Sequence, residues 1–178
     1  PADGDPLRGT IKSKPRHCFL MTKLGAPIDK ETEEIRKAVK KICGKFHYSL
    51  IDATTNITGG DFLLKIWKSI AATPLVVGVH HESMPKETIL NIYYELGIAQ
   101  ALGKETIIVK SEKANTPSDL VRTEYVEFNA DFSKNFSRYL SGLDERAEYY
   151  ETMADQLEND PVLSIDYLRR AFLITGND

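Results

Sequence analysis

Apolar and polar residues alternate along the chain in blocks that predict strands and helices in turn. Short apolar runs rich in β-branched residues predict five strands, at residues 17–22, 46–52, 74–79, 106–109 and 124–128. Between these runs, apolar residues recur three and four positions apart, which predicts amphipathic helices. Residues 74–110 therefore read strand, helix, strand, a unit that closes right-handed and places its two strands parallel.

Strands that alternate with helices predict a flavodoxin-like α/β fold, a doubly wound parallel five-stranded sheet with the strand order 2-1-3-4-5. After Asn129 the spacing is helical only, and Pro161 suits a first helical turn, so a C-terminal helical extension is expected. We thus predict a flexible arm at residues 1–16, an α/β domain at 17–129 and C-terminal helices at 130–178. Asp29 or Thr32 is expected to open the first helix, and Gly44 to end it.

Composition narrows the class of protein. The 178 residues suffice for a full core, and 42% apolar with 28% charged residues is typical of a soluble globular protein. A net charge of −3 gives no field that would attract nucleic acid or an anionic membrane. The only two cysteines, Cys18 and Cys43, fall in a predicted strand and helix, which favours a reduced, cytoplasmic protein.

Targeting segments are not evident. No apolar run approaches the roughly 18 residues of a membrane span, and no signal peptide opens the chain. The first residue is Pro1 rather than Met, as expected of a fragment of a longer polypeptide.

Glu95 is the residue most suggestive of chemistry. It is expected within the first two turns of the helix after residue 88, where a carboxylate does not fit the buried stripe of Ile92, Leu96 and Ala99. Helices of a parallel sheet begin at the carboxyl ends of the strands, where such folds bind ligands. A carboxylate there can stabilise or attack the cationic anomeric carbon of a breaking N-glycosidic bond. The alternative is a helix-surface glutamate that favours the helix dipole.

Residues 91–104, NIYYELGIAQALGK, resemble the NxxYELGxAxALGK signature of nucleoside 2-deoxyribosyltransferase-like and TIR-like domains. The resemblance covers roughly residues 17–128, and this helix carries its specific motif. It implies that Glu95 is the catalytic carboxylate acting on an N-glycosidic bond. It also implies a homo-oligomer, because a second subunit often completes the site in such folds.

Two neighbours of Glu95 are candidates for positioning the sugar. Asn91 lies one helical turn earlier on the same face, so it can orient Glu95 or bind a ribose hydroxyl, or else serve as the helix N-cap. Tyr94 can stack on a base or pack on the sheet.

Further candidates lie in loops after the strands. Lys23 and Gly25 could hold a phosphate, although neither phosphate-loop motif is present and an ordinary turn is the alternative. Asp52 could contact ribose or cap its loop, and His80 could act as an acid or contact the sugar. Asp119 could approach the site or cap a short helix. The adjacent histidines at 80 and 81 point opposite ways in an extended chain, so no metal site is predicted.

The sequence therefore predicts cleavage or transfer at an N-glycosidic bond of a nucleotide, a nucleoside or NAD, with no metal or tightly held cofactor. The alternative is a non-catalytic module that senses a nucleotide or binds a protein within a larger defence or signalling protein. Ile89 favours the alternative, because deoxyribosyltransferases carry an aspartate at that position. No nucleic-acid or membrane partner is expected.

Overall fold

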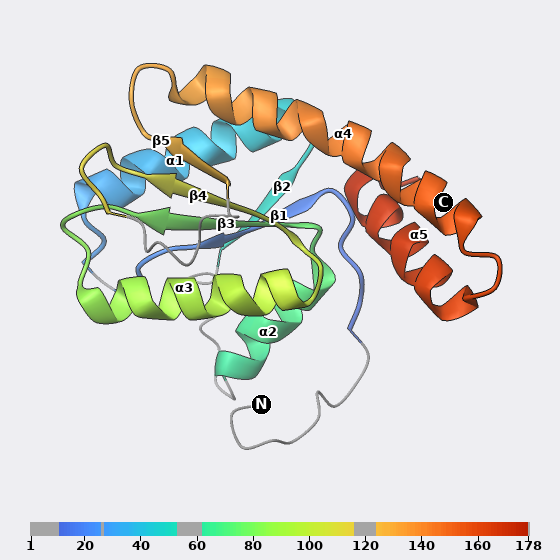
Figure 1. Cartoon of the computed structure of the whole chain (residues 1–178). Coiled ribbons are helices and arrows are strands. Elements are labelled where there is room, and N and C mark those ends of the chain that lie inside the picture. The colour runs from blue at the N-terminus through green and yellow to red at the C-terminus, as the bar shows by residue number, and fades with distance from the viewer. Residues whose placement is uncertain (1–10, 26, 53–61, 116–123, 178) are drawn as a thin grey trace.

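A computed structural model describes residues 11–25, 27–52, 62–115 and 124–177 (Figure 1). Most of the arm predicted at 1–16 and the loops predicted at 53–60 and around Asp119 lie outside these residues. Within them, Lys14 N–H donates to the carbonyl of Ala72 at 2.8 Å, and Arg16 N–H donates to that of Leu173 at 2.9 Å. The segment entering the first strand is therefore hydrogen-bonded to two helix ends.

Five parallel strands form one sheet in the order β2-β1-β3-β4-β5, as predicted. Their bounds are β1 His17–Met21, β2 Ser49–Asp52, β3 Leu75–His80, β4 Glu105–Lys110 and β5 Glu124–Glu127. In the centre, Val76 of β3 pairs with Phe19 of β1 and Thr106 of β4. Every residue of β3 is buried, because helices cover both faces of a parallel sheet.

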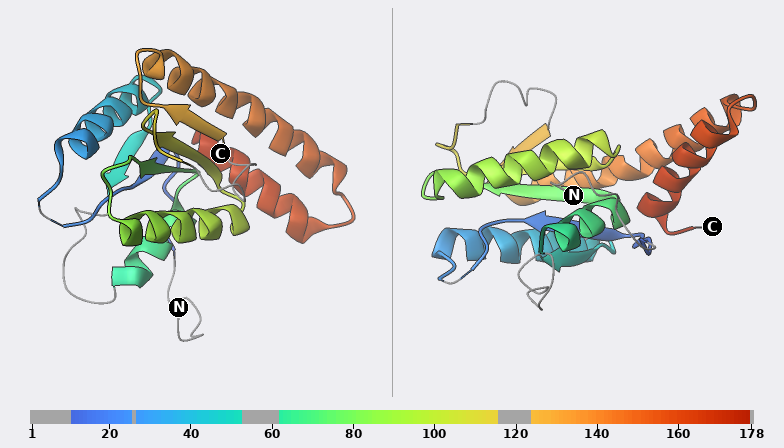
Figure 2. Two further views of the ribbon diagram at one scale, coloured as in Figure 1. Left: turned by 60° about the vertical axis from the view of Figure 1, so that its left-hand side comes forward. Right: turned by 90° about the horizontal axis from the view of Figure 1, so that it is seen from below.

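Helices α1 and α4 cover one face of the sheet, and α2 and α3 cover the other (Figures 1 and 2). The helices are α1 Lys30–Lys45, α2 Phe62–Ala72, α3 Lys86–Ala101, α4 Phe132–Gln156 and α5 Pro161–Thr175. This arrangement confirms the predicted doubly wound, flavodoxin-like fold with C-terminal helices.

Helix ends follow local chemistry. Asp29 caps α1, because its carboxylate accepts a hydrogen bond from Thr32 N–H at 2.8 Å. Of the two predicted starts, Asp29 and Thr32, the structure therefore has the first. Gly44 does not end α1, which continues through Lys45. Pro161 occupies the first turn of α5, as predicted, and Gly176 ends it in the left-handed conformation, with a φ of 74°.

The start of α3 differs from expectation. The helix begins at Lys86, directly after Pro85, rather than near Ile89. Proline holds a backbone angle that suits a helix start, and the polar residues that follow it face solvent, so they read as loop in sequence. Glu95 consequently lies in the third turn of α3, and Asn91 lies inside the helix instead of capping it.

The first half of α4 belongs to the main core. Phe132, Phe136, Leu140 and Leu143 are buried in the same cluster as the strands. The second half extends beyond the sheet and packs against α5 (Figure 2). We call this pair, residues 148–175, the helical hairpin.

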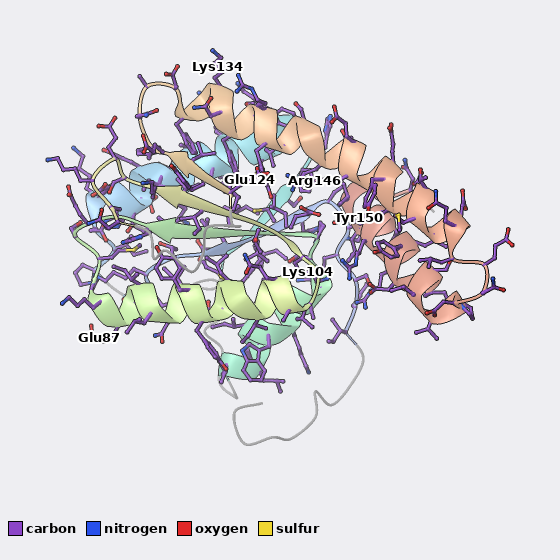
Figure 3. The ribbon with its side chains drawn as sticks, viewed as in Figure 1. Glu87, Lys104, Glu124, Lys134, Arg146 and Tyr150 are labelled. Atoms are coloured by element: carbon purple, nitrogen blue, oxygen red, sulfur yellow. The ribbon has the colours of Figure 1, made fainter. Side chains whose placement is uncertain are left out.

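An ion-pair network fixes α4 over the sheet edge. Arg146 contacts Glu105 of β4 and Glu124 of β5, the latter at 2.9 Å, and Tyr150 donates to Glu105 at 2.5 Å (Figure 3). The arginine therefore links α4 to two neighbouring strands at once.

Candidate functional site

A cavity of about 500 Å³ lies between α2 and α3, at the carboxyl end of β1. Connections leave β1 and β3 toward opposite faces of the sheet, so this is the switch point where doubly wound folds bind ligands. The described residues that line it are Thr22, Leu24, Leu63, Ile66, Thr88, Asn91, Ile92, Tyr94 and Glu95. Three of the predicted site residues, Asn91, Tyr94 and Glu95, thus share one cavity.

Glu95 is half-buried in the wall of this cavity. Within the described part of the chain, its carboxyl group forms no hydrogen bond or ion pair. Burial raises the pKa of Glu95 from its ordinary value of 4.5 to about 7. The helix dipole does not offset this effect, because it acts mainly within the first turn and Glu95 lies in the third. The pKa of this carboxyl group therefore lies close to neutral pH, as the pKa values of catalytic acids and bases often do.

Asn91 and Tyr94 lie on the solvent side of the cavity. Asn91 is exposed one turn before Glu95, and Tyr94 is 57% exposed at the rim. Both side chains can therefore meet a ligand that enters from solvent.

The other residues that line the cavity were not predicted as site residues from the sequence. Leu24, Leu63, Ile66 and Ile92 present an apolar surface, and Thr22 and Thr88 complete the lining. Their sequence signals were present but ambiguous, because a helical stripe such as Leu63 and Ile66 predicts packing equally well. Among the lining residues that the structure describes, none carries a positive charge.

Three other predicted residues do not line the cavity. Lys23 donates to the carbonyl of Pro27 at 3.1 Å, and Gly25 is exposed with a φ of 85°. Asp52 is buried and contacts the Arg36 guanidinium of α1 at 2.6 Å. Lys23 and Asp52 therefore interact with other groups of the protein, whereas Gly25 faces solvent.

His80 is buried at the end of β3, with Nδ1 2.6 Å from the hydroxyl of Tyr93. Burial, with the nearby charges of His81 and Lys110, lowers the pKa of His80. Asp119 lies outside the described residues.

His81 fastens the start of α1 to the loop after β3. One ring nitrogen lies 2.7 Å from the hydroxyl of Thr32 and 3.3 Å from Asp29, and the other lies 2.9 Å from Ser83 and 3.4 Å from Glu31. In the described ranges, no group of three or more His, Cys, Asp or Glu side chains is placed to hold a metal ion. The contacts of His81 link the first turn of α1 to the loop after β3.

A second hollow, of about 550 Å³, lies between β5 and α4. Its lining includes Arg146 and Glu124, which are already paired with each other. It lies at the sheet edge, away from the switch point, so we take the cavity around Glu95 as the candidate site.

In the described ranges, none of the helices has both the length and the apolar character that crossing a membrane requires.

Comparison with solved structures supports the fold. A 2-deoxyribosyltransferase from the psychrotolerant bacterium Bacillus psychrosaccharolyticus superposes with a TM-score of 0.51 at 11% identity, over 68% of this chain and 90% of that chain. Clostridium botulinum CMP N-glycosidase superposes with a TM-score of 0.46 at 21% identity, over 70% of this chain and 98% of its own. The sequence matches no protein-family model and no curated protein. The first likeness confirms a nucleoside 2-deoxyribosyltransferase-like fold, and the TIR-like relation stays a prediction.

Proposed function

We propose that this protein cleaves the N-glycosidic bond of a nucleoside, with Glu95 as the catalytic carboxylate. The observation that carries the proposal is the state of Glu95. It is a half-buried carboxyl without a partner among the described residues, its pKa is raised to about 7, and it faces a cavity of about 500 Å³ at the switch point of the sheet. The motif at 91–104 and the name of the first fold neighbour are compatible with this chemistry.

In the proposed reaction, the bond between the anomeric carbon and the base nitrogen breaks, and its electron pair leaves with the base. Positive charge then develops on the sugar. Ionised Glu95 either stabilises this cation or attacks it to form a glycosyl ester. Water, or the nitrogen of a second base, finally bonds to the anomeric carbon, which leaves the carboxylate free, and the proton that this acceptor loses passes to the departed base.

The walls of the cavity favour an uncharged substrate. Leu24, Leu63, Ile66 and Ile92 suit the faces of a base, and the amide of Asn91 suits a ribose hydroxyl. Phosphate recognition usually employs Arg, Lys or a helix N-terminus. Leu63 and Thr88 lie in the first turns of α2 and α3, but no cation lines the described part of the cavity, so we place a nucleoside ahead of a nucleotide or NAD.

The proposed role of Tyr94 is to cover the bound base. Its side chain lines the cavity, and Tyr94 is 57% exposed. A base stacked on such a ring contributes roughly 1–3 kcal/mol to binding. Replacing Tyr94 with alanine should therefore raise KM more than it lowers kcat.

A product assay tests the proposal. The purified chain is incubated separately with purine and pyrimidine nucleosides, nucleoside monophosphates and NAD, and free base or nicotinamide is measured by chromatography. Wild-type protein should release base from at least one nucleoside, and Glu95→Gln should release none. Glu87→Gln, which changes an exposed glutamate in the first turn of the same helix, is the matched control and should retain turnover. Turnover retained by Glu95→Gln would remove Glu95 from the mechanism.

A non-catalytic sensor is the second candidate. It is favoured by one observation: among the described lining residues Glu95 is the single acid, so no second carboxyl is seen that could protonate the leaving base. A sensor would bind a nucleoside, measured by calorimetry, and return it intact after prolonged incubation.

A further inference from the structure

The outer face of α5 is unusually apolar for a helix that faces solvent. Val162 is 79% exposed, Ile165 65% and Leu168 47%, and these positions recur three residues apart along the helix. Tyr149 of α4, also exposed, belongs to the same helical hairpin. Five of the nine large apolar side chains that are exposed among the described residues lie in the hairpin, which is far more than an even distribution would place there. Such clustering is typical of an interaction surface.

A groove of about 510 Å³ lies at this face. Its apolar lining comes from α5 and consists of Ile165, Leu168, Ala171 and Phe172, and Glu151 of α4 is among its polar residues. The inner side of α5 packs against α4, so the groove lies on the side of α5 that α4 leaves open. A groove lined in this way accepts the apolar side of another helix.

Acidic side chains border the groove on the α4 side. Glu148, Glu151, Asp155 and Glu158 are exposed and recur three or four positions apart, so they follow one side of α4 and the turn after it. We call these four residues the acidic row. None of the four forms an ion pair within the described ranges, and Glu151 places the row at the groove itself.

The helical hairpin as a whole concentrates negative charge. Residues 148–175 include six acidic and two basic residues, which gives a net charge of −4, whereas the whole chain has a net charge of −3. Arg170 is paired with Asp166 at 2.6 Å, so Arg169 is the only basic residue of the hairpin without an ion pair in the described part of the chain. The charge of this surface therefore favours a basic partner.

We propose that the outer face of α5 and the acidic row bind an amphipathic helix that carries lysine or arginine beside its apolar side. The apolar side chains of that helix fill the groove at Ile165 and Leu168, and its cations meet the acidic row. Helix α5 has 15 residues and is about 22 Å long, so a partner helix of about four turns covers it. The hairpin projects beyond the sheet in both views of Figure 2, so a partner can reach it without contacting the sheet. This binding does not depend on the catalytic role proposed for Glu95.

The same charges disfavour other occupants. Nucleic acids and anionic membranes present phosphate groups, which the acidic row repels. A second copy of the hairpin would set one acidic row against another. Of these occupants, a basic amphipathic helix is the one that matches both the apolar groove and its acidic border.

Synthetic helical peptides, titrated into the full chain at about 0.15 M salt and followed by fluorescence anisotropy, test the proposal. The first peptide has about 18 residues, with leucines three and four positions apart on one side and lysine at most other positions. The second carries glutamate in place of lysine, and the third has the composition of the first in an order that is not amphipathic. The lysine peptide should bind with a Kd below about 100 μM. Its affinity should exceed that of either other peptide by about 10-fold or more.

A substitution in the groove tests the apolar contact. Ile165→Ser should weaken binding of the lysine peptide roughly 10-fold or more, because it removes an apolar side chain from the lining of the groove. Leu90→Ser is the matched control, because Leu90 is 67% exposed on α3, outside the hairpin, and this variant should bind the peptide like wild type. Circular dichroism verifies that both variants fold.

Charge reversal tests whether the partner is basic. Glu151→Lys should weaken binding of the lysine peptide roughly threefold or more and strengthen that of the glutamate peptide. Glu87→Lys changes an exposed glutamate of α3 and should leave both affinities unchanged. A lysine peptide that binds no better than the other two, or an Ile165→Ser variant with unchanged affinity, would overturn the proposal. Sedimentation of wild type, but not of Ile165→Ser, with vesicles of phosphatidylcholine and phosphatidylserine would overturn it in favour of a membrane surface.

Discussion

Replacing Glu95 with glutamine removes the charge from the cavity wall at almost constant size. Burial raises the pKa of Glu95 in the folded chain from 4.5 to about 7. The folded state therefore holds this proton more tightly than the unfolded state does. It follows that the contribution of Glu95 to stability is fully present below the unfolded pKa and is lost as the pH rises through the folded pKa.

The size of the effect follows from the interval between the two pKa values. Each unit of pKa difference corresponds to about 1.4 kcal/mol. The interval of roughly 2.5 units therefore lowers the free energy of unfolding of wild type by up to about 3 kcal/mol above pH 8. Glu95→Gln has no charge to desolvate. The free energy of unfolding of this variant should equal that of wild type at pH 4 and exceed it by up to about 3 kcal/mol at pH 8. For a chain of this length the melting temperature would then differ by roughly 6–12 °C.

Thermal and urea unfolding, followed by circular dichroism at intervals from pH 4 to pH 8, measures the difference between variant and wild type. Subtraction cancels every titration that the two proteins share. Glu87→Gln is the control, because Glu87 is exposed at the start of α3 (Figure 3), and its difference should stay within about 0.5 kcal/mol at every pH. A difference for Glu95→Gln that does not change with pH would show that the carboxyl is solvated, and the case for a poised catalytic group would fail.

Three further predictions concern activity, packing and capping. If ionised Glu95 acts in catalysis, kcat/KM for base release should rise about tenfold per pH unit below pH 7 and level off above it. Gly78→Ala should cost about 1–3 kcal/mol in urea unfolding, because the new Cβ would lie 2.7 Å from Cδ1 of buried Leu96, whereas Gly97→Ala on the open side of α3 should stabilise by up to about 1 kcal/mol. Asp29→Ala should cost about 1–2 kcal/mol at pH 7 and much less at pH 2. Burial raises the pKa of the Asp29 carboxyl, but hydrogen bonds from Thr32 outweigh burial, so the pKa lies below its usual value. The stability that these hydrogen bonds give is lost as the pH falls through the folded pKa.

The fold could be predicted because its signals are local and repeated. Each buried strand is a short apolar run, and each helix that covers the sheet carries a stripe with helical spacing. The displaced start of α3 arose where polar residues after Pro85 form a solvent-facing turn, and the second strand begins at Ser49 rather than at the predicted Phe46. Polarity alone does not separate such a turn from a loop.

The site was predictable only in part, because pairings between distant elements decide which side chains remain available. Asn91, Tyr94 and Glu95 share one helix, so their spacing was enough to place them together. Asp52 instead meets Arg36 of α1, and His80 meets Tyr93 of α3. Neither contact follows from spacing within one element.

The short edge strand β5 limits the addition of further strands to the sheet. It has four residues, and glutamates stand at both its ends. Charge and short length discourage an added strand, so this edge of the sheet offers little template for growth into fibrils. Growth of continuous filaments by strand addition at β5 is therefore not expected, even in concentrated solution.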